Sequence, residues 1–195
     1  MKNNDHYHFS DFTTNNFRKS IIKAKENYTF RLYYNFNKDE KFIIWRHDVD
    51  CSVHRARKLA RIENEEGIIA NYFLLLHNRF YNLFEKEITQ CVRDIIDLGH
   101  EIGLHFDVDY YRINNVDKLQ KYLEIEKKLL ENFFQIDIKT FSFHDPTSFA
   151  LSCKDWQYAG MINTYAAYFQ DNVEYCSDSN GYWIHKRLYD MLDEA

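Results

Sequence analysis

The stretch Gly67-Ile-Ile-Ala-Asn-Tyr-Phe-Leu-Leu-Leu-His77 is an almost unbroken apolar run that starts after a glycine and stops at a histidine. Hydrophobicity at consecutive positions, rather than at every second one, is typical of a parallel strand buried on both faces. The preceding residues 53–65 form a helical candidate that follows Ser52, a suitable N-cap. Gly67 then lies where a left-handed residue commonly ends a helix, so this part of the chain predicts a helix followed directly by a buried strand.

The same alternation recurs from residue 41 onward, which predicts an α/β fold. Two further stretches, 84–95 and 119–133, carry apolar residues at helical spacing, and Gly99 precedes the next strand as Gly67 does. Besides 68–76, five apolar runs are predicted as strands, namely 42–45, 102–104, 138–143, 161–165 and 173–176.

No linker or change in composition interrupts this pattern, so we expect a single β/α domain over residues 41–195. Residues 1–40 are polar and aromatic, and we expect them to form an N-terminal helical cover. Its helix is expected to follow Thr13 and to place Ile21 and Ala24 on one face.

Composition excludes several classes of protein. The 195 residues are 45% hydrophobic and carry a net charge of −5 without a block of like charges, so no nucleic-acid partner is expected. No segment approaches the roughly 18 apolar residues of a membrane span, and the first residues lack the apolar stretch of a signal peptide. We therefore expect a soluble, cytoplasmic protein. The 4 cysteines are far apart and form no Cys-x-x-Cys pair, which argues against a disulfide framework or a structural zinc knuckle.

Polar residues that bind metals or move protons follow five of the predicted strands. In parallel α/β folds the loops that leave the carboxyl ends of the strands share one face, and catalytic groups gather there. The segments at these ends are 46–50, 77–78, 105–109, 144–146 and 177–178. In an extended segment Asp48 and Asp50 project to the same side, about 6 to 7 Å apart, so one can bind a cation and the other can hold a water.

Asp50 and His105 are the strongest candidates for ligands of a divalent ion. Histidine and carboxylate ligands from separate strands, with one position left for water, fit zinc best. The third ligand stays open between His144, which ends the next strand, and Asp109, which lies four residues after His105. The preference of zinc for imidazole favours His144. Asp107 is a weaker candidate.

Four segments, in this order along the chain, resemble the polysaccharide deacetylase family, the NodB-homology carbohydrate esterases, and in particular a branch found with surface-polysaccharide genes. They are Arg46-His-Asp-Val-Asp50, Gly99-His-Glu-Ile-Gly-Leu-His105, Ser142-Phe-His-Asp-Pro146 and Ser177-Asp-Ser-Asn-Gly-Tyr-Trp183. The succession of all four is far more specific than any one of them.

The resemblance implies a distorted (β/α) barrel and a metal-dependent hydrolase that removes an N-acetyl group from a sugar or polysaccharide precursor. It implies Asp48 as the general base and Asp50 and His105 as metal ligands. We further expect Asp178 to orient a catalytic group through a hydrogen bond. The partner implied is an N-acetylated carbohydrate substrate.

The sequence departs from the family at two points. The family commonly places a second ligand histidine where this chain has Asp109. Its closing strand, which supplies a general-acid histidine, has no counterpart after Tyr189, so we expect a barrel that is incomplete at the C-terminus. The leaving amine is then expected to take its proton from His77, from His144 if that residue is not a ligand, or from protonated Asp48.

These departures support an alternative function. A truncated homologue with weak or no activity would bind a saccharide or act as an assembly partner. It would then form a homo-oligomer or bind a partner chain that covers the open edge of the barrel, because unpaired strand edges recruit partners.

Overall fold

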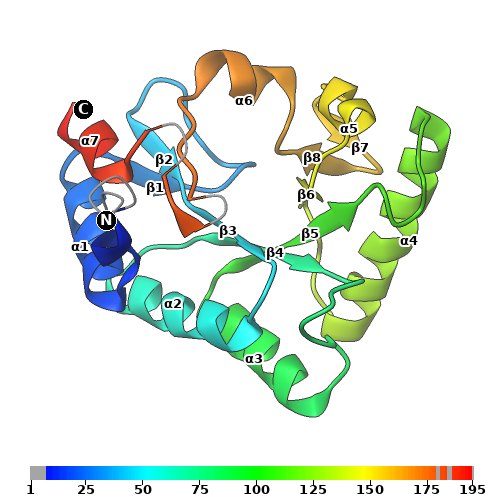
Figure 1. Ribbon diagram of the computed structural model, residues 1–195, viewed down its shortest axis with the longest axis horizontal. Coiled ribbons are helices and arrows are strands. Elements are labelled where there is room, and N and C mark those ends of the chain that lie inside the picture. The colour runs from blue at the N-terminus through cyan, green and yellow to red at the C-terminus, as the bar shows by residue number, and fades with distance from the viewer. Residues whose placement is uncertain (1–7, 179–180, 184–185, 195) are drawn as a thin grey trace, which may run out of the picture.

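A computed structural model describes residues 8–178, 181–183 and 186–194 of the protein. A mixed α/β fold surrounds one six-stranded sheet, in the order β3-β4-β5-β6-β8-β7 (Figure 1). Neighbouring strands run parallel, except that β7 is antiparallel to β8. The strands are β3 (Arg46–Val49), β4 (Asn71–Leu75), β5 (Glu101–Asp107), β6 (Thr140–His144), β7 (Gln157–Tyr158) and β8 (Met161–Asn163).

Helices lie around this sheet, and α2 and α3 cover it side by side (Figure 1). Gly67 and Gly99 have φ angles of 72° and 88° and lie between these two helices and the strands that follow, which confirms the predicted helix ends. The helices are η2 (Phe9–Phe12), α1 (Thr14–Asn27), α2 (Val53–Glu65), α3 (Lys86–Asp97), α4 (Val116–Phe134), α5 (Ser148–Ser152), α6 (Ala167–Asn172) and α7 (Leu188–Asp193).

The two faces of the sheet have different surroundings because side chains alternate along each strand. Tyr72 and Leu74 of β4 belong to the main apolar core, together with buried residues of α2, α3 and α4. Phe73, between them in sequence, belongs to a separate cluster with Tyr33 and Phe169. All five residues of β4 are therefore buried, as expected for a strand covered on both faces. We call the face that carries Phe73 the inner face.

Gly103 makes room for the ring of Phe73 on the inner face. These two residues are paired in register between β4 and β5. A Cβ atom on Gly103 would lie 2.5 Å from two ring carbons of Phe73 and 2.9 Å from Oγ1 of Thr140. The guanidinium of Arg46 lies over the Phe73 ring, 5.1 Å from its centre.

Two of the predicted strands are wrong in part or in whole. The predicted strand 42–45 is present as β2 (Phe42–Ile44), but it pairs with β1 (Thr29–Arg31) in a separate parallel sheet, and the first strand of the main sheet, β3, starts at Arg46. Asp48 therefore lies within a strand rather than after one. Residues 173–176 form no strand; they follow α6, and although Val173 packs against the cluster of Tyr33, Phe73 and Phe169, Glu174 and Tyr175 are exposed.

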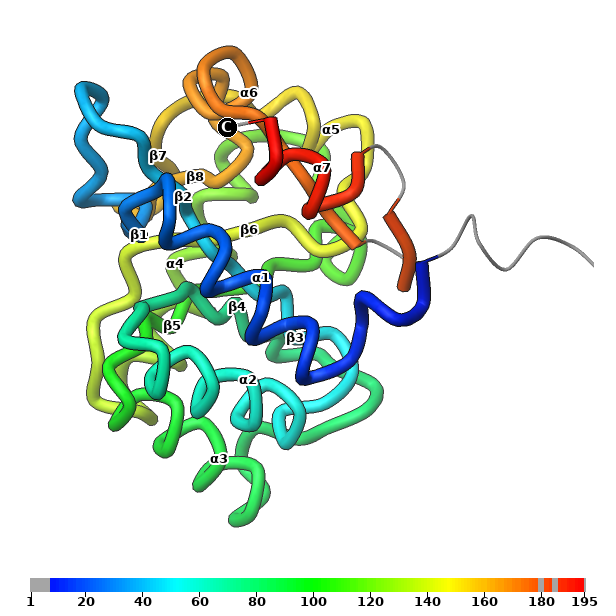
Figure 2. Tube along the Cα trace, turned by 90° about the vertical axis from the view of Figure 1, so that its left-hand side faces the viewer, coloured from blue at the N-terminus to red at the C-terminus, as the bar shows by residue number. Residues whose placement is uncertain are grey.

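The N-terminal helix agrees with its prediction. Thr13 caps α1 by accepting a hydrogen bond from the Asn16 N–H, and Ile21 and Ala24 are fully buried. The C-terminal helix α7 lies beside α1 (Figure 2), where the hydroxyl of Tyr189 donates to the Asn16 carbonyl. The helices α1 and α7 are thus packed together.

The ladders among the described residues give an open sheet, with β3 and β7 at its edges, and do not close it into a barrel. Over the same residues, every helix is too short or too polar to span a lipid bilayer.

Candidate metal centre

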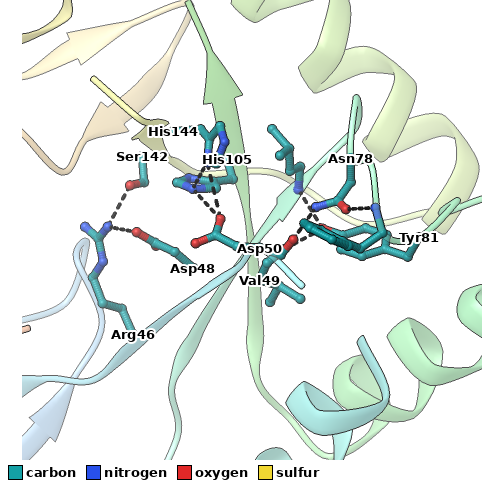
Figure 3. A network of polar contacts seen from close by, with 11 residues as sticks. Arg46, Asp48, Val49, Asp50, Asn78, Tyr81, His105, Ser142 and His144 are labelled. Carbon is teal, nitrogen blue, oxygen red and sulfur yellow. Dashed lines mark hydrogen bonds and ion pairs between the residues drawn. The ribbon is translucent and has the colours of Figure 1, made fainter. Parts of the chain in front are cut away.

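Three potential metal ligands meet at the carboxyl end of the sheet. Asp50 follows β3, His105 lies in β5 and His144 is the last residue of β6. His105 is paired in register with Leu75 on one side and with Ser142 on the other, and residues paired in this way share a face. The alternation along β6 then puts His144 on the same inner face as Ser142. Figure 3 shows the Asp50 carboxylate directed at both imidazoles.

The donor atoms of these residues form a nearly equilateral triangle. Oδ1 of Asp50 lies 3.2 Å from Nε2 of His105 and 3.3 Å from Nδ1 of His144, and the two nitrogens are 3.2 Å apart. A tetrahedral zinc ion with bonds of about 2.0 to 2.1 Å needs ligand atoms about 3.3 Å apart. The residues therefore fit three corners of such a tetrahedron, and three protein ligands are the number found in catalytic zinc sites.

The electrostatics of the triad favour a cation. Burial alone raises the pKa of Asp50, but its hydrogen bonds with His105 and His144 outweigh that effect and hold the pKa well below the ordinary value. The hydrogen bond with Asp50 in turn raises the pKa of His144. Asp50 is thus ionised and ready to pair with positive charge. Nδ1 of His105 is buried and has no hydrogen-bond partner among the described residues.

Asp48 lies beside the triad on the inner face and is tied to Arg46 by an ion pair (Figure 3). Arg46 is mostly buried, with 16% of its side chain exposed. It also donates to the hydroxyls of Ser142 and Thr164, at 2.7 and 3.1 Å. The guanidinium therefore fixes the carboxylate of Asp48 from one side.

The structure brings His144, and not Asp109, together with Asp50 and His105 among the described residues. Asp109 is exposed in the turn after β5, where its N–H donates to Oδ1 of Asp107 at 2.9 Å. Asp107 accepts a second such bond from the N–H of Tyr110 and so caps this turn.

Asp178, predicted to be catalytic, lies exposed in the segment after α6, and its carbonyl accepts a hydrogen bond from Gly181. Its orienting role stays a prediction.

His77, a predicted proton donor, faces the helix α4. Its Nε2 lies 3.0 Å from the buried carboxylate of Glu126 and 2.8 Å from the hydroxyl of Tyr111. Its ring stacks on Tyr110 with centres 3.6 Å apart. In the sequence, this cluster is indicated by Glu126, a charged residue on the otherwise apolar face of the predicted helix 119–133.

A second buried carboxylate supports β3 from the opposite face of the sheet. Glu63 of α2 is fully buried, pairs with His47 at 2.6 Å and accepts a hydrogen bond from the hydroxyl of Tyr72. Nδ1 of His100 lies 3.6 Å from the same carboxylate. These contacts hold His47 on the face of the sheet opposite the triad.

A scan against models of protein families finds no match, and neither does a search of curated proteins. Among solved structures, the chain is similar to the deacetylase PplD of Streptococcus pyogenes in complex with acetate, with a TM-score of 0.52 and 13% sequence identity. The similar region covers 70% of this chain and 65% of that deacetylase, less than two thirds of its length. At this identity the likeness establishes a shared mixed α/β fold with a parallel sheet.

Proposed function

We propose that the protein is a metal-dependent deacetylase that removes an N-acetyl group from a sugar or polysaccharide precursor. The observation that carries this proposal is the triangle of donor atoms of Asp50, His105 and His144. Two further observations support it: the fold is shared with a deacetylase solved with acetate, and four sequence segments resemble the polysaccharide deacetylase family. Membership of that family, with its barrel, is part of the proposal.

Asp50, His105 and His144 would hold the ion, and zinc is the proposed metal. When bound, a zinc ion supplies Lewis acidity that polarises a carbonyl group and makes water more acidic. The described residues provide two nitrogen donors and one oxygen donor, a set that suits zinc better than the all-oxygen sites preferred by magnesium or calcium.

Asp48 is proposed as the general base. It lies on the same face as the triad without belonging to it, so its carboxylate is available to accept the proton of the attacking water. Arg46 limits the positions that this carboxylate adopts, because the guanidinium is itself held by Ser142 and Thr164. Fixing the base in this way reduces the entropy lost on reaching the transition state.

The leaving amine needs a proton when the C–N bond of the acetamide breaks. His144 belongs to the donor triangle and His77 is engaged by Glu126, so we propose that Asp48 returns to the nitrogen the proton that it took from water. Acetate and a free amine are the products. Asp178 is retained as a proposed orienting residue, and its substitution is considered in the Discussion.

The remaining proposals concern the whole chain. Residues 1–40 are proposed as a cover and residues 41–195 as the catalytic domain. The proposed substrate is a cytoplasmic sugar precursor. A homo-oligomer or a partner chain is proposed at the open edge of the sheet, where β3 and β7 are the edge strands among the described residues.

Acetate release by the full chain tests the proposal. Chitooligosaccharides and nucleotide-linked N-acetylhexosamines are incubated with the purified protein before and after treatment with a chelator, and then after zinc is restored. We expect release that is lost with the chelator and regained with zinc. If the chelator does not change the rate of acetate release, the metal-dependent mechanism is ruled out. A protein that binds zinc and saccharide but releases no acetate would instead favour the non-catalytic saccharide-binding alternative.

A further inference from the structure

The loop after β4 contacts the turn that carries Asp50 at two points. Nδ2 of Asn78 donates a hydrogen bond to the main-chain carbonyl of Asp50 at 2.8 Å. The hydroxyl of Tyr81 donates to the carbonyl of Val49 at 2.6 Å. Figure 3 shows both side chains on the far side of Asp50 from Asp48 and Arg46. The loop therefore holds the backbone of this turn while the carboxylate of Asp50 faces the histidines.

The hydroxyl of Tyr81 also joins β3 to β4. Val49 is paired in register with Leu74, and the next N–H along β4, that of Leu75, donates to the Tyr81 hydroxyl at 3.2 Å. One hydroxyl thus bonds to the last carbonyl of β3 and the last N–H of β4. It does so at the point where the chain leaves the sheet to place Asp50.

Asn78 uses both ends of its amide group. Its Oδ1 accepts a hydrogen bond from the N–H of Phe80 at 2.7 Å, which shapes the loop as an Asx turn. Its Nδ2 is then directed at the Asp50 carbonyl. The contact with Asp50 is therefore made by a side chain that the loop itself holds in place.

Asp50 needs such support because it lies beyond the end of its strand. Its side chain is 48% exposed, and among the described residues its own N–H bonds only to the nearby Asp48 carbonyl, at 3.0 Å. By contrast, His105 lies within a strand, with ladder partners on both sides. Metal ligands must be held to within about 0.5 Å of the binding geometry. Asp50 is thus the ligand whose backbone depends most on contacts outside the sheet.

We propose that Asn78 and Tyr81 are positioning residues of the metal centre, which hold the Val49–Asp50 turn so that the Asp50 carboxylate completes the donor triangle. The inference rests on the proposed function in that it requires the triad to bind a divalent ion. Hydrogen-bonding partners of this kind typically change metal affinity by about 10- to 100-fold when they are removed.

Cobalt(II) titration of the full chain tests this role, because the visible absorption of cobalt reports its coordination geometry. Tyr81→Phe removes only the bridging hydroxyl, and Asn78→Ala removes the amide. Two substitutions are matched controls. Asn82→Ala removes an Asx turn of the same kind, in which Oδ1 accepts from Phe84 at 3.1 Å, and Tyr189→Phe removes a hydroxyl that bonds to a carbonyl in α1.

We expect Tyr81→Phe and Asn78→Ala each to weaken cobalt binding by about 10- to 100-fold and to alter the visible spectrum. The two controls should bind cobalt as the wild type does. Circular dichroism of each metal-free variant identifies those that fold, and if one of the two positioning variants does not fold, the other carries the test.

If the folded positioning variants bind cobalt with wild-type affinity and give the wild-type visible spectrum, this inference is wrong, but the proposed metal centre is unaffected. Failure of the wild-type protein to bind cobalt or zinc would overturn the metal centre itself, and this inference with it. Equal weakening in the Asn78→Ala and Asn82→Ala variants would also overturn it, because the effect would then belong to the Asx turns and not to the contact with Asp50.

Discussion

Oδ1 of Asp50 lies 3.2 Å from Nε2 of His105, although β4 lies between the two strands from which these residues come. Strands two apart in a sheet are separated by about 10 Å. The Asp50 carboxylate reaches His105 because Asp50 lies in a bend after β3. This bend is at the carboxyl end of the sheet, where β4 also ends, at Leu75. The contact therefore depends on the assembled sheet and cannot form within any one segment of the chain.

Removing any one of the three triad side chains should weaken zinc binding strongly. We expect Asp50→Ala, His105→Ala and His144→Ala each to reduce affinity by at least about a hundredfold, because each ligand supplies a large share of the binding free energy. Calorimetric titration with zinc measures the effect. His54→Ala is the control, since this half-exposed histidine contacts Cys91 and lies outside the triad. Wild-type affinity in His144→Ala would exclude that residue as a ligand.

Asp48→Asn should separate catalysis from metal binding. The amide cannot accept the proton of water, so kcat for acetate release should fall by about 10²- to 10⁴-fold. Zinc affinity should stay close to that of the wild type, because Asp48 is not one of the donor atoms. A parallel loss of zinc would show that Asp48 acts on the ion and not as a base.

Asp178→Asn tests the orienting role predicted from the sequence. An orienting hydrogen bond should make kcat fall by about 10- to 100-fold with little change in KM. Asp171→Asn, on the exposed end of α6, is the control for loss of a surface charge. An unchanged kcat in Asp178→Asn would remove this residue from the catalytic machinery.

Gly103→Ala should destabilise the protein by overpacking the inner face. The new methyl group would lie 2.5 Å from the Phe73 ring, and strain of this kind costs about 1 to 3 kcal/mol. Urea denaturation gives the free energy of unfolding. Phe73→Leu in the same chain should recover part of the loss, because the smaller side chain vacates the space. If the double variant is as unstable as the sum of the two single variants, the clash is not the cause.

The contact between Asp11 and Arg187 should make stability depend on pH. Asp11 is 7% exposed and accepts two hydrogen bonds from Arg187, at 2.6 and 2.8 Å. The bond from Arg187 lowers the pKa of Asp11, even though burial opposes the shift. The folded state therefore binds this proton less readily than the unfolded state, so the contribution to stability is full above about pH 4 and is lost as the pH falls further.

We expect Asp11→Asn to lower the free energy of unfolding by about 1 to 3 kcal/mol at pH 7, with a difference from the wild type that shrinks below about pH 4. Urea denaturation across this pH range measures both values. Asp193→Asn is the matched control, because its ion pair with Lys23 also joins α7 to α1, but Asp193 is largely exposed and solvent screens the pair, so the substitution should have a much smaller effect. A constant difference at all pH values would contradict the assignment.

Much of the sheet could be predicted from the sequence because its central strands are buried on both faces. The apolar runs 68–76 and 161–165 contain β4 and β8, the run 138–143 covers β6 except for its last residue, His144, and glycines mark the ends of two helices. The strand β3 was missed because Arg46 and Asp48 make it look polar. Their charges are paired on the inner face, and a linear pattern does not show such pairing.

The site was predicted in part for a similar reason. The positions of Asp50 and His105 in the segments after predicted strands indicated that they would meet, although His105 lies within β5. The choice between His144 and Asp109 depended on the turn after β5. In that turn the carboxylate of Asp107 accepts hydrogen bonds from two main-chain N–H groups, and the side chain of Asp109 is exposed. The contacts of Asn78 and Tyr81 depend on loop conformation, which hydrophobic periodicity does not encode.

The spacing of the donor triangle also selects among ions by radius. Donors held 3.2 to 3.3 Å apart suit metal–ligand bonds of about 2 Å. Calcium requires bonds of about 2.3 to 2.6 Å, so it would have to push the three side chains apart against the strands and the loop that carry them. The spacing of these donors thus suits small transition-metal ions better than calcium.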